Sequence, residues 1–224
     1  FPNEKKINKI FQYWLFASLI LVFSIIIVGG LTRLTDSGLS ITEWELFKGL
    51  LPPLSKNSWI EYFEEYKKIP QYKLLNFDMS LSEFKVIFYW EYFHRILARI
   101  IGIFFMLPLI YFYFSKKIKD EYIKICLIIF SLIIFQGIIG WYMVKSGLVN
   151  VITVSHYRLS IHLFTAIIII SLIYWLLMNV LTKKNKIFFN FSKDNSIFIF
   201  LIFLIFAQII LGAFVSGLDA GKIY

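Results

Sequence analysis

The sequence predicts an all-α integral membrane protein, with a four-helix transmembrane bundle followed by the first helix of a second, pseudo-repeated bundle. Of its 224 residues, 59% are hydrophobic, against about 45–50% in soluble domains. Five apolar runs each approach the ~20 residues that a helix needs to cross a bilayer, and the end of the chain resembles the end of its first run. Helix is the default for each run, because a spanning segment must satisfy its own backbone hydrogen bonds.

The five predicted transmembrane helices lie at about 11–31, 86–114, 125–144, 159–181 and 197–218. The first run is too long for the core of a signal peptide and lacks a small-residue cleavage site, so we expect it to stay as an anchor. Because the chain begins with Phe1 rather than Met, and Tyr224 follows an apolar run directly, we expect both ends to continue in a longer protein.

Lysines gather in alternate connections between the runs. Four lie at 116–124 and four at 183–193, whereas the intervening connection has only Lys145 before Arg158. The positive-inside rule therefore places the N-terminus in the cytoplasm and residues 32–85 outside. Because the net charge of +9 resides in short loops and forms no stripe on a folded surface, we expect no nucleic acid partner.

The external connection at 32–85 contains one short amphipathic pattern. Ser58 is a predicted N-cap for a helix that begins at Trp59. Trp59, Phe63 and Tyr66 recur at helical spacing among charged residues, which is typical of a helix on the membrane surface. Such a helix either covers a site that opens outward or forms part of a packed loop.

A weak internal repeat sets the predicted division of the chain. "GGLTRLTDSG" at 29–38 aligns without gaps with "GAFVSGLDAG" at 212–221, matching two glycines and an aspartate. Membrane proteins often contain such duplicated units. Residues 1–182 are therefore predicted to form one four-helix unit, and residues 183–224 a cytoplasmic loop and the first helix of a second unit.

The second apolar run carries four ionisable residues in "WEYFHRILAR". Measured around the helix from Glu91, His94 lies at about −60°, Arg95 at about +40° and Arg99 at about +80°. The four therefore share one face. Ionisable groups within a membrane almost always face the bundle interior and usually mark a functional site.

The fourth run provides a counterpart in "YRLSIHL", where Arg158 and His162 lie four residues apart on one face. Two histidines on parallel helices of a bundle suit the axial ligation of a heme iron. Arginines 95, 99 and 158 suit the heme propionates. Structural zinc is less favoured because it takes four ligands. Each histidine is alternatively a hydrogen-bonded packing residue, and Glu91 a structural salt-bridge partner of Arg95.

At these residues the chain resembles the heme A synthase family, in its mitochondrial and alphaproteobacterial branch. The matching stretches run in order over nearly the whole chain. They are "GGLTRLTDSGLSITEW" (29–44), "FDMSLSEFKVIFYWEYFHRILARIIG" (77–102), "QGIIGWYMVKSGL" (136–148), "SHYRLSIHL" (155–163) and "GAFVSGLDAGKIY" (212–224). Some bacterial relatives carry a cysteine pair in the first external loop; residues 32–85 contain no cysteine, which fits the branch named.

The resemblance implies a membrane oxidoreductase of eight helices in two halves, each holding a heme between two histidines. The half seen here would receive heme O, whose ring methyl is oxidised to the formyl of heme A for cytochrome oxidase assembly. It implies His94 and His162 as the ligand pair and Glu91 as the catalytic carboxylate. A heme b is expected in the other half.

The resemblance further implies a location in the bacterial inner membrane, or in the mitochondrial inner membrane if the source is eukaryotic. The expected partners are heme O, the lipid bilayer, heme O synthase and cytochrome oxidase assembly factors. Two rival functions remain. A b-type cytochrome that only transfers electrons explains the histidines but gives Glu91 no role, and a transporter or structural subunit without heme explains only the helices and the repeat.

Overall fold

A computed structural model describes residues 2–43, 48–150, 154–183, 195–218 and 220. Within those ranges the ordered elements are all helical. They are α1 (Pro2–Leu34), the 3-10 turn η1 (Lys48–Leu50), α2 (Lys56–Lys67), α3 (Pro70–Leu75), α4 (Leu81–Ser115), α5 (Asp120–Asn150), α6 (His156–Thr182) and α7 (Ser196–Gly217). Five of these helices, α1 and α4 to α7, are long and apolar enough to cross a membrane. The predicted all-α integral membrane fold is confirmed.

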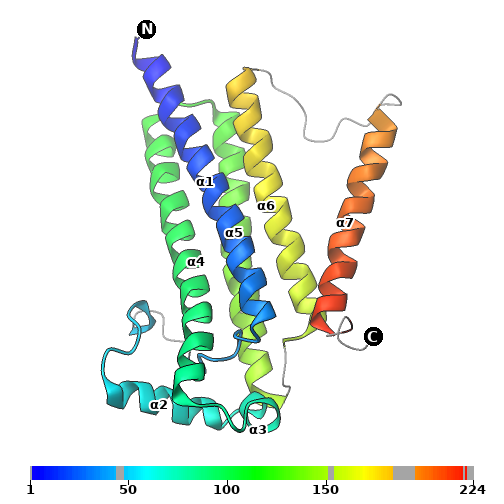
Figure 1. Cartoon of the computed structure of the whole chain (residues 1–224). Coiled ribbons are helices and arrows are strands. Elements are labelled where there is room, and N and C mark those ends of the chain that lie inside the picture. The colour runs from blue at the N-terminus through cyan, green and yellow to red at the C-terminus, as the bar shows by residue number, and fades with distance from the viewer. Residues whose placement is uncertain (1, 44–47, 151–153, 184–194, 219, 221–224) are drawn as a thin grey trace.

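Four helices form a closed bundle, and α7 packs on its outside (Figure 1). Helix α1 contacts α4 and α6, and α5 contacts the same two helices, so that α1 and α5 lie across the diagonal. Helices α4 and α6 run in the same direction, with their N-terminal ends on the side where α2 and α3 lie (Figure 1). Side chains of α4 and α6 at similar depth therefore meet inside one bundle.

Helix α4 begins earlier than the hydropathy pattern indicates, because Ser80 and Glu83 form a capping box. The Ser80 backbone N–H donates to Glu83 Oε2 at 2.8 Å, and the Glu83 N–H donates to Ser80 Oγ at 3.3 Å. The 35 residues of α4 give it a length of about 52 Å, whereas the hydrocarbon core measures ~30 Å. Helix α4 therefore extends well outside the membrane.

The predicted cap of α2 is wrong. Helix α2 begins at Lys56, and its N-cap is Ser55, whose Oγ accepts from the Ser58 N–H at 3.1 Å. Ser58 is instead the third residue of the helix, and its hydroxyl accepts from the Ser55 N–H. The sequence pattern pointed to Ser58 because it lies directly before Trp59, where the aromatic residues begin. Ser55, which follows the Pro-Pro turn, is the residue that caps the helix.

The apolar face of α2 contacts protein and is not laid on lipid as a membrane-surface helix would be. Trp59, Phe63 and Tyr66 are buried, and the rings of Trp59 and Phe88 lie 4.9 Å apart. The ring of Phe63 lies 5.0 Å from that of Phe84. Helix α2 is thus a packed cover over the first turns of α4.

Two apolar clusters divide the bundle along its length. The cluster that we name the outer cluster joins the segment between α1 and α4 to the start of α4, and the inner core fills the bundle beyond the histidines. The outer cluster comprises Leu39, Ile41, Trp59, Phe63, Tyr66, Ile69, Phe84, Ile87 and Phe88. The inner core comprises Phe11, Trp14, Leu15, Val22, Ile101, Phe105, Leu109, Phe112, Ile123, Cys126, Ile129, Ile169, Ile173, Leu176, Leu177 and Val180.

Helix α7 is fixed to the bundle at the end where α6 begins. A methyl group on Gly217 would lie 2.8 Å from the Cα of His156, closer than real Cβ atoms approach. The Arg33 guanidinium donates to the Ser216 carbonyl at 2.5 Å. Most of the predicted cytoplasmic loop, at 184–194, and the repeat positions 219 and 221 lie outside the described residues.

Candidate functional site

The two histidines lie in the layer between the outer cluster and the inner core. On α4 the outer cluster ends at Phe88 and the inner core begins at Ile101, so His94 falls between them. On α6 the core begins at Ile169, one to two turns beyond His162. Both histidines therefore lie in the same layer of one bundle, on helices that run in the same direction.

Each imidazole borders a glycine of a neighbouring helix. A Cβ added to Gly29 of α1 would lie 3.3 Å from His94 Nε2, and one added to Gly140 of α5 would lie 3.3 Å from His162 Cε1. His162 Nδ1 is buried and has no hydrogen-bond partner among the described residues. A buried polar atom without a partner is costly, so the His162 ring has an unused nitrogen that a bound group could engage.

The donor set fits a heme better than a metal ion held by protein alone. Within the described ranges, no group of three or more His, Cys, Asp or Glu side chains is placed to hold a metal ion. A structural zinc takes four such ligands, whereas a heme already supplies four nitrogens and needs only axial ones. The donor chemistry of the two imidazoles, His94 and His162, therefore fits a heme iron.

Glu91 is 2% exposed and accepts four hydrogen bonds. Its Oε2 accepts from Ser40 Oγ at 2.7 Å and from the Ile41 N–H at 2.9 Å. Its Oε1 accepts from Arg95 Nε at 3.0 Å and Nη2 at 2.5 Å. The same Nη2 also donates to the Ile41 carbonyl at 3.1 Å. The carboxylate thus joins α4 to the segment that follows α1, and it forms the salt bridge that the sequence offered as an alternative role.

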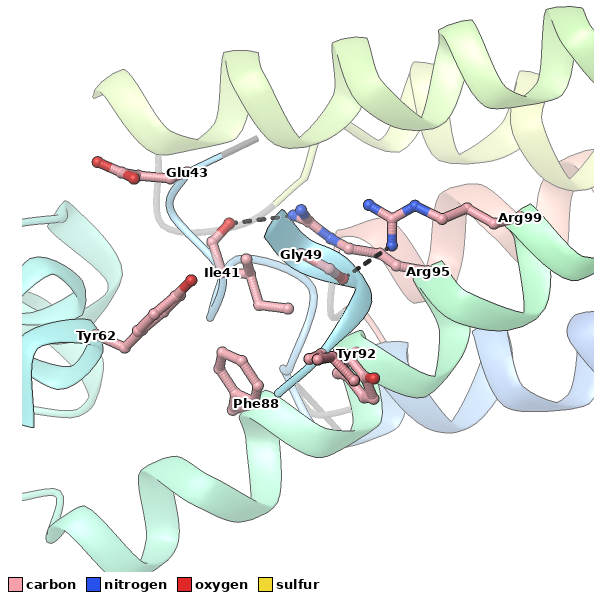
Figure 2. A pocket seen from close by; sticks show the side chains of 9 residues that line it. Ile41, Glu43, Gly49, Tyr62, Phe88, Tyr92, Arg95 and Arg99 are labelled. Atoms are coloured by element: carbon pink, nitrogen blue, oxygen red, sulfur yellow. Dashed lines mark hydrogen bonds between the residues drawn. The ribbon is translucent and has the colours of Figure 1, made fainter. Parts of the chain in front are cut away.

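Two of the three predicted arginines line one pocket beneath the external segment. Figure 2 shows Arg95 donating to the Ile41 carbonyl and Arg99 to the Gly49 carbonyl, the latter at 3.2 Å. The lining is otherwise mixed aromatic, aliphatic and acidic. It comprises Ile41, Glu43, Gly49, Leu51, Tyr62, Phe88, Tyr92, Arg95 and Arg99.

The third arginine, Arg158, lies against α5 and is not in the lining of this pocket. Its guanidinium lies 4.3 Å over the ring of Tyr142. Its Nη2 donates to the Tyr142 hydroxyl at 3.3 Å, and its Nη1 donates to Ser146 Oγ. The sequence left open which of the three arginines would bind the propionates. In the structure Arg95 and Arg99 line one pocket and Arg158 does not.

The sequence reasoning missed Gln136, which contacts the second histidine from α5. Its side-chain Nε2 donates to the His162 carbonyl at 2.7 Å, and its Oε1 is buried without a partner in the described part of the chain. Ser40 and Ile41 were missed as partners of Glu91. The only sequence signal for these three residues was that each falls within a stretch that resembles the family.

Comparison with known proteins agrees with this geometry. A family profile described as "Cytochrome oxidase assembly protein" matches residues 12–224. A heme A synthase of Pelagibacter ubique is 52% identical over 226 residues, which cover 100% of this chain and 66% of the relative.

Two further relatives carry the same name. That of Rickettsia bellii is 47% identical over 94% of this chain and 63% of its own length. That of Flavobacterium psychrophilum is 43% identical over 98% and 65% respectively. No solved structure matches. The chain spans just under two thirds of the length of these relatives, and it belongs to the cytochrome oxidase assembly protein family.

Proposed function

We propose that the protein containing this chain is a heme A synthase, a membrane oxidoreductase that oxidises the ring methyl of heme O to the formyl of heme A. The observation that carries the proposal is that His94 of α4 and His162 of α6 lie in one layer of the bundle, each against a glycine of a neighbouring helix. It is joined by 52% identity to a relative of that name. In this proposal heme O is the substrate, and its oxidised product serves cytochrome oxidase assembly.

His94 and His162 would hold the substrate iron. A neutral imidazole presents one ring nitrogen to a metal, and both rings lie in a layer with apolar clusters above and below. The iron and porphyrin supply the redox chemistry when bound. The protein supplies two fixed ligands and a bundle interior that excludes water.

Arg95 and Arg99 would bind the propionates of the substrate. Both guanidiniums now donate to backbone carbonyls at the pocket, and a carboxylate is a stronger acceptor for arginine than a neutral carbonyl. Arg158 would act as a further propionate partner from the His162 side. Engaging it requires release from Ser146 and Tyr142.

Glu91 is the proposed catalytic carboxylate. It lies one turn before His94 on α4, and its four hydrogen bonds hold it at a fixed orientation beside the ligand layer. A carboxylate in such a position can accept a proton during oxidation. The donors that hold Glu91 come from Arg95 and from Ser40–Ile41, so proton acceptance would accompany movement of the segment after α1.

We also propose the topology and the location. The N-terminus is cytoplasmic, and residues 32–85 lie on the outer side of a bacterial inner membrane, or of the mitochondrial inner membrane. Residues 1–182 form the heme O unit, and residues 183–224 lead into a second unit that carries heme b. The partner proteins of this proposal are heme O synthase and cytochrome oxidase assembly factors.

The alternative is a b-type cytochrome that only transfers electrons. The paired histidines favour it equally, since both functions need bis-histidine ligation. The saturated hydrogen bonding of Glu91 also fits a purely structural carboxylate. The two functions differ in the heme that the protein carries.

The test is to purify the full-length protein from cells that make heme O, extract its heme and identify it by mass. Heme O or heme A together with heme b supports the synthase. Heme b alone supports the electron-transfer protein. Absence of heme overturns the assignment of His94 and His162 as ligands.

A further inference from the structure

Two glycines of the bundle lie directly against the imidazoles of the proposed ligands. A methyl group on Gly29 would lie 3.3 Å from Nε2 and 3.5 Å from Cδ2 of His94. A methyl group on Gly140 would lie 3.3 Å from Cε1 of His162. Contacts of 3.3 Å are tighter than nine in ten real Cβ contacts. Each ring therefore uses space that the neighbouring helix leaves open by having no side chain there.

The two contacts fall on different atoms of the imidazole. At His94 the contact is with Nε2 and its neighbour Cδ2, and at His162 it is with Cε1, which is bonded to both ring nitrogens. The contacts come from different helices, since Gly29 lies on α1 and Gly140 on α5. Each histidine ring thus lies against a glycine of a different helix.

The other glycines of these helices do not share this property. No described atom lies within 4 Å of a Cβ placed on Gly30, the next residue of α1, or on Gly137, which lies one turn before Gly140 on α5. Glycine is unfavourable in a helix interior relative to alanine. At 30 and 137 the structure offers no contact that requires glycine, whereas at 29 and 140 the imidazoles do.

Gln136 strengthens the case for the α5 contact. It lies one turn before Gly140, and its side chain donates to the backbone carbonyl of His162. Helix α5 therefore holds the backbone of His162 through Gln136 and leaves space for its ring at Gly140. Histidine ligands commonly depend on neighbouring residues that fix the ring orientation.

We infer that Gly29 and Gly140 are positioning residues that seat the His94 and His162 imidazoles for iron ligation, an inference that rests on the proposed heme binding. Relief of a 3.3 Å contact requires the ring to move by a few tenths of an ångström. Metal–ligand distances hold to within about 0.2 Å. Alanine at either position therefore moves the imidazole from the place that it occupies in the structure, and a ring seated there for iron ligation would lose its position.

The experiment uses the full-length protein with Gly29→Ala and Gly140→Ala, and with Gly30→Ala and Gly137→Ala as matched controls. Each control introduces the same methyl group on the same helix and the same change in helix propensity. Three quantities are measured: monodispersity by size exclusion, heme per protein, and carbon monoxide binding by the reduced protein. An iron with two imidazole ligands has no open position, so carbon monoxide binding reports a displaced ligand.

We expect Gly29→Ala and Gly140→Ala to remain monodisperse, to lose about tenfold in heme affinity, and to bind carbon monoxide where the wild type and both controls do not. Four variants that all match the wild type would overturn the inference and leave the proposed function standing. Loss of folding in both test variants, with folded controls, would also overturn it, because the inference concerns ligand geometry. A wild-type protein without heme would overturn the proposed function itself.

Discussion

Replacement of Glu91 by glutamine tests whether its carboxylate joins the external segment to α4. The amide keeps one acceptor oxygen but places an NH2 group against donors from Ser40, Ile41 or Arg95. Removing one partner of a buried ion pair costs about 3–5 kcal/mol. The Arg95 side chain is 15% exposed and keeps the Ile41 carbonyl as an acceptor, so we expect the low end, about 3 kcal/mol.

For a chain of this size, each kcal/mol of lost unfolding free energy lowers the melting temperature by about 2 °C. Glu91→Gln should therefore melt about 6 °C below the wild type. Ser40→Ala removes one donor and leaves the charge, and should cost about 1 kcal/mol. The assay is thermal unfolding of the purified protein in detergent, followed by tryptophan fluorescence. A Glu91→Gln protein that melts with the wild type would refute the network described here.

The same pair of variants separates a chemical role of Glu91 from a holding role. Glu91→Gln should retain heme, because His94 and His162 are unchanged, but should form no heme A. Ser40→Ala loosens the network and keeps the carboxylate, so it should form heme A. Equal loss of heme A in both variants would assign Glu91 to holding the segment, and normal heme A in Glu91→Gln would remove it from the mechanism.

Three further outcomes follow from the structure. His94→Ala and His162→Ala should each lose heme O and heme A, as read from the pyridine hemochrome spectrum, while they retain heme b and stay monodisperse. Gly217→Ala should lower the melting temperature, because its methyl group would lie 2.8 Å from the His156 Cα, while Gly30→Ala should not. Burial raises the pKa of Tyr66 to about 12 from 10.0, so the folded state holds its proton more tightly than the unfolded one. Stability from this group is therefore present below pH 10 and is lost as pH rises toward 12, and Tyr66→Phe should flatten the decline in denaturant titrations at pH 9–12.

The helices and the placement of the two histidines inside the bundle were predictable because their signals are local. Each spanning helix is a continuous apolar run, and Glu91, His94 and Arg95 fall on one helical face by spacing alone. The early start of α4 was also readable, since Ser80 and Glu83 stand at capping-box spacing. The predicted start of this helix at 86 followed from hydropathy, which does not register a capping box.

The hydrogen-bond partners of the site were not predictable in this way. Ser40 and Ile41 lie about 50 residues before Glu91 in the sequence, and no period connects a loop residue with a helix face across that distance. For Arg158 the helix face was predictable, but the contacts of the side chain were not. Its spacing from His162 correctly places both on one helix face, but its long side chain turns to Tyr142 and Ser146 of α5.

The arrangement of the two apolar clusters explains why the polar residues are tolerated in this membrane bundle. The outer cluster, with α2 as its cover, closes the layer from one side, and the inner core closes it from the other. Between them, Glu91 and Arg95 neutralise each other and satisfy backbone groups of the external segment. His162 has no such internal compensation, since its Nδ1 is buried without a partner in the described structure. The cost of burying polar groups in this layer therefore falls on His162 more than on the ion pair, and in the proposed function the binding of heme would offset it.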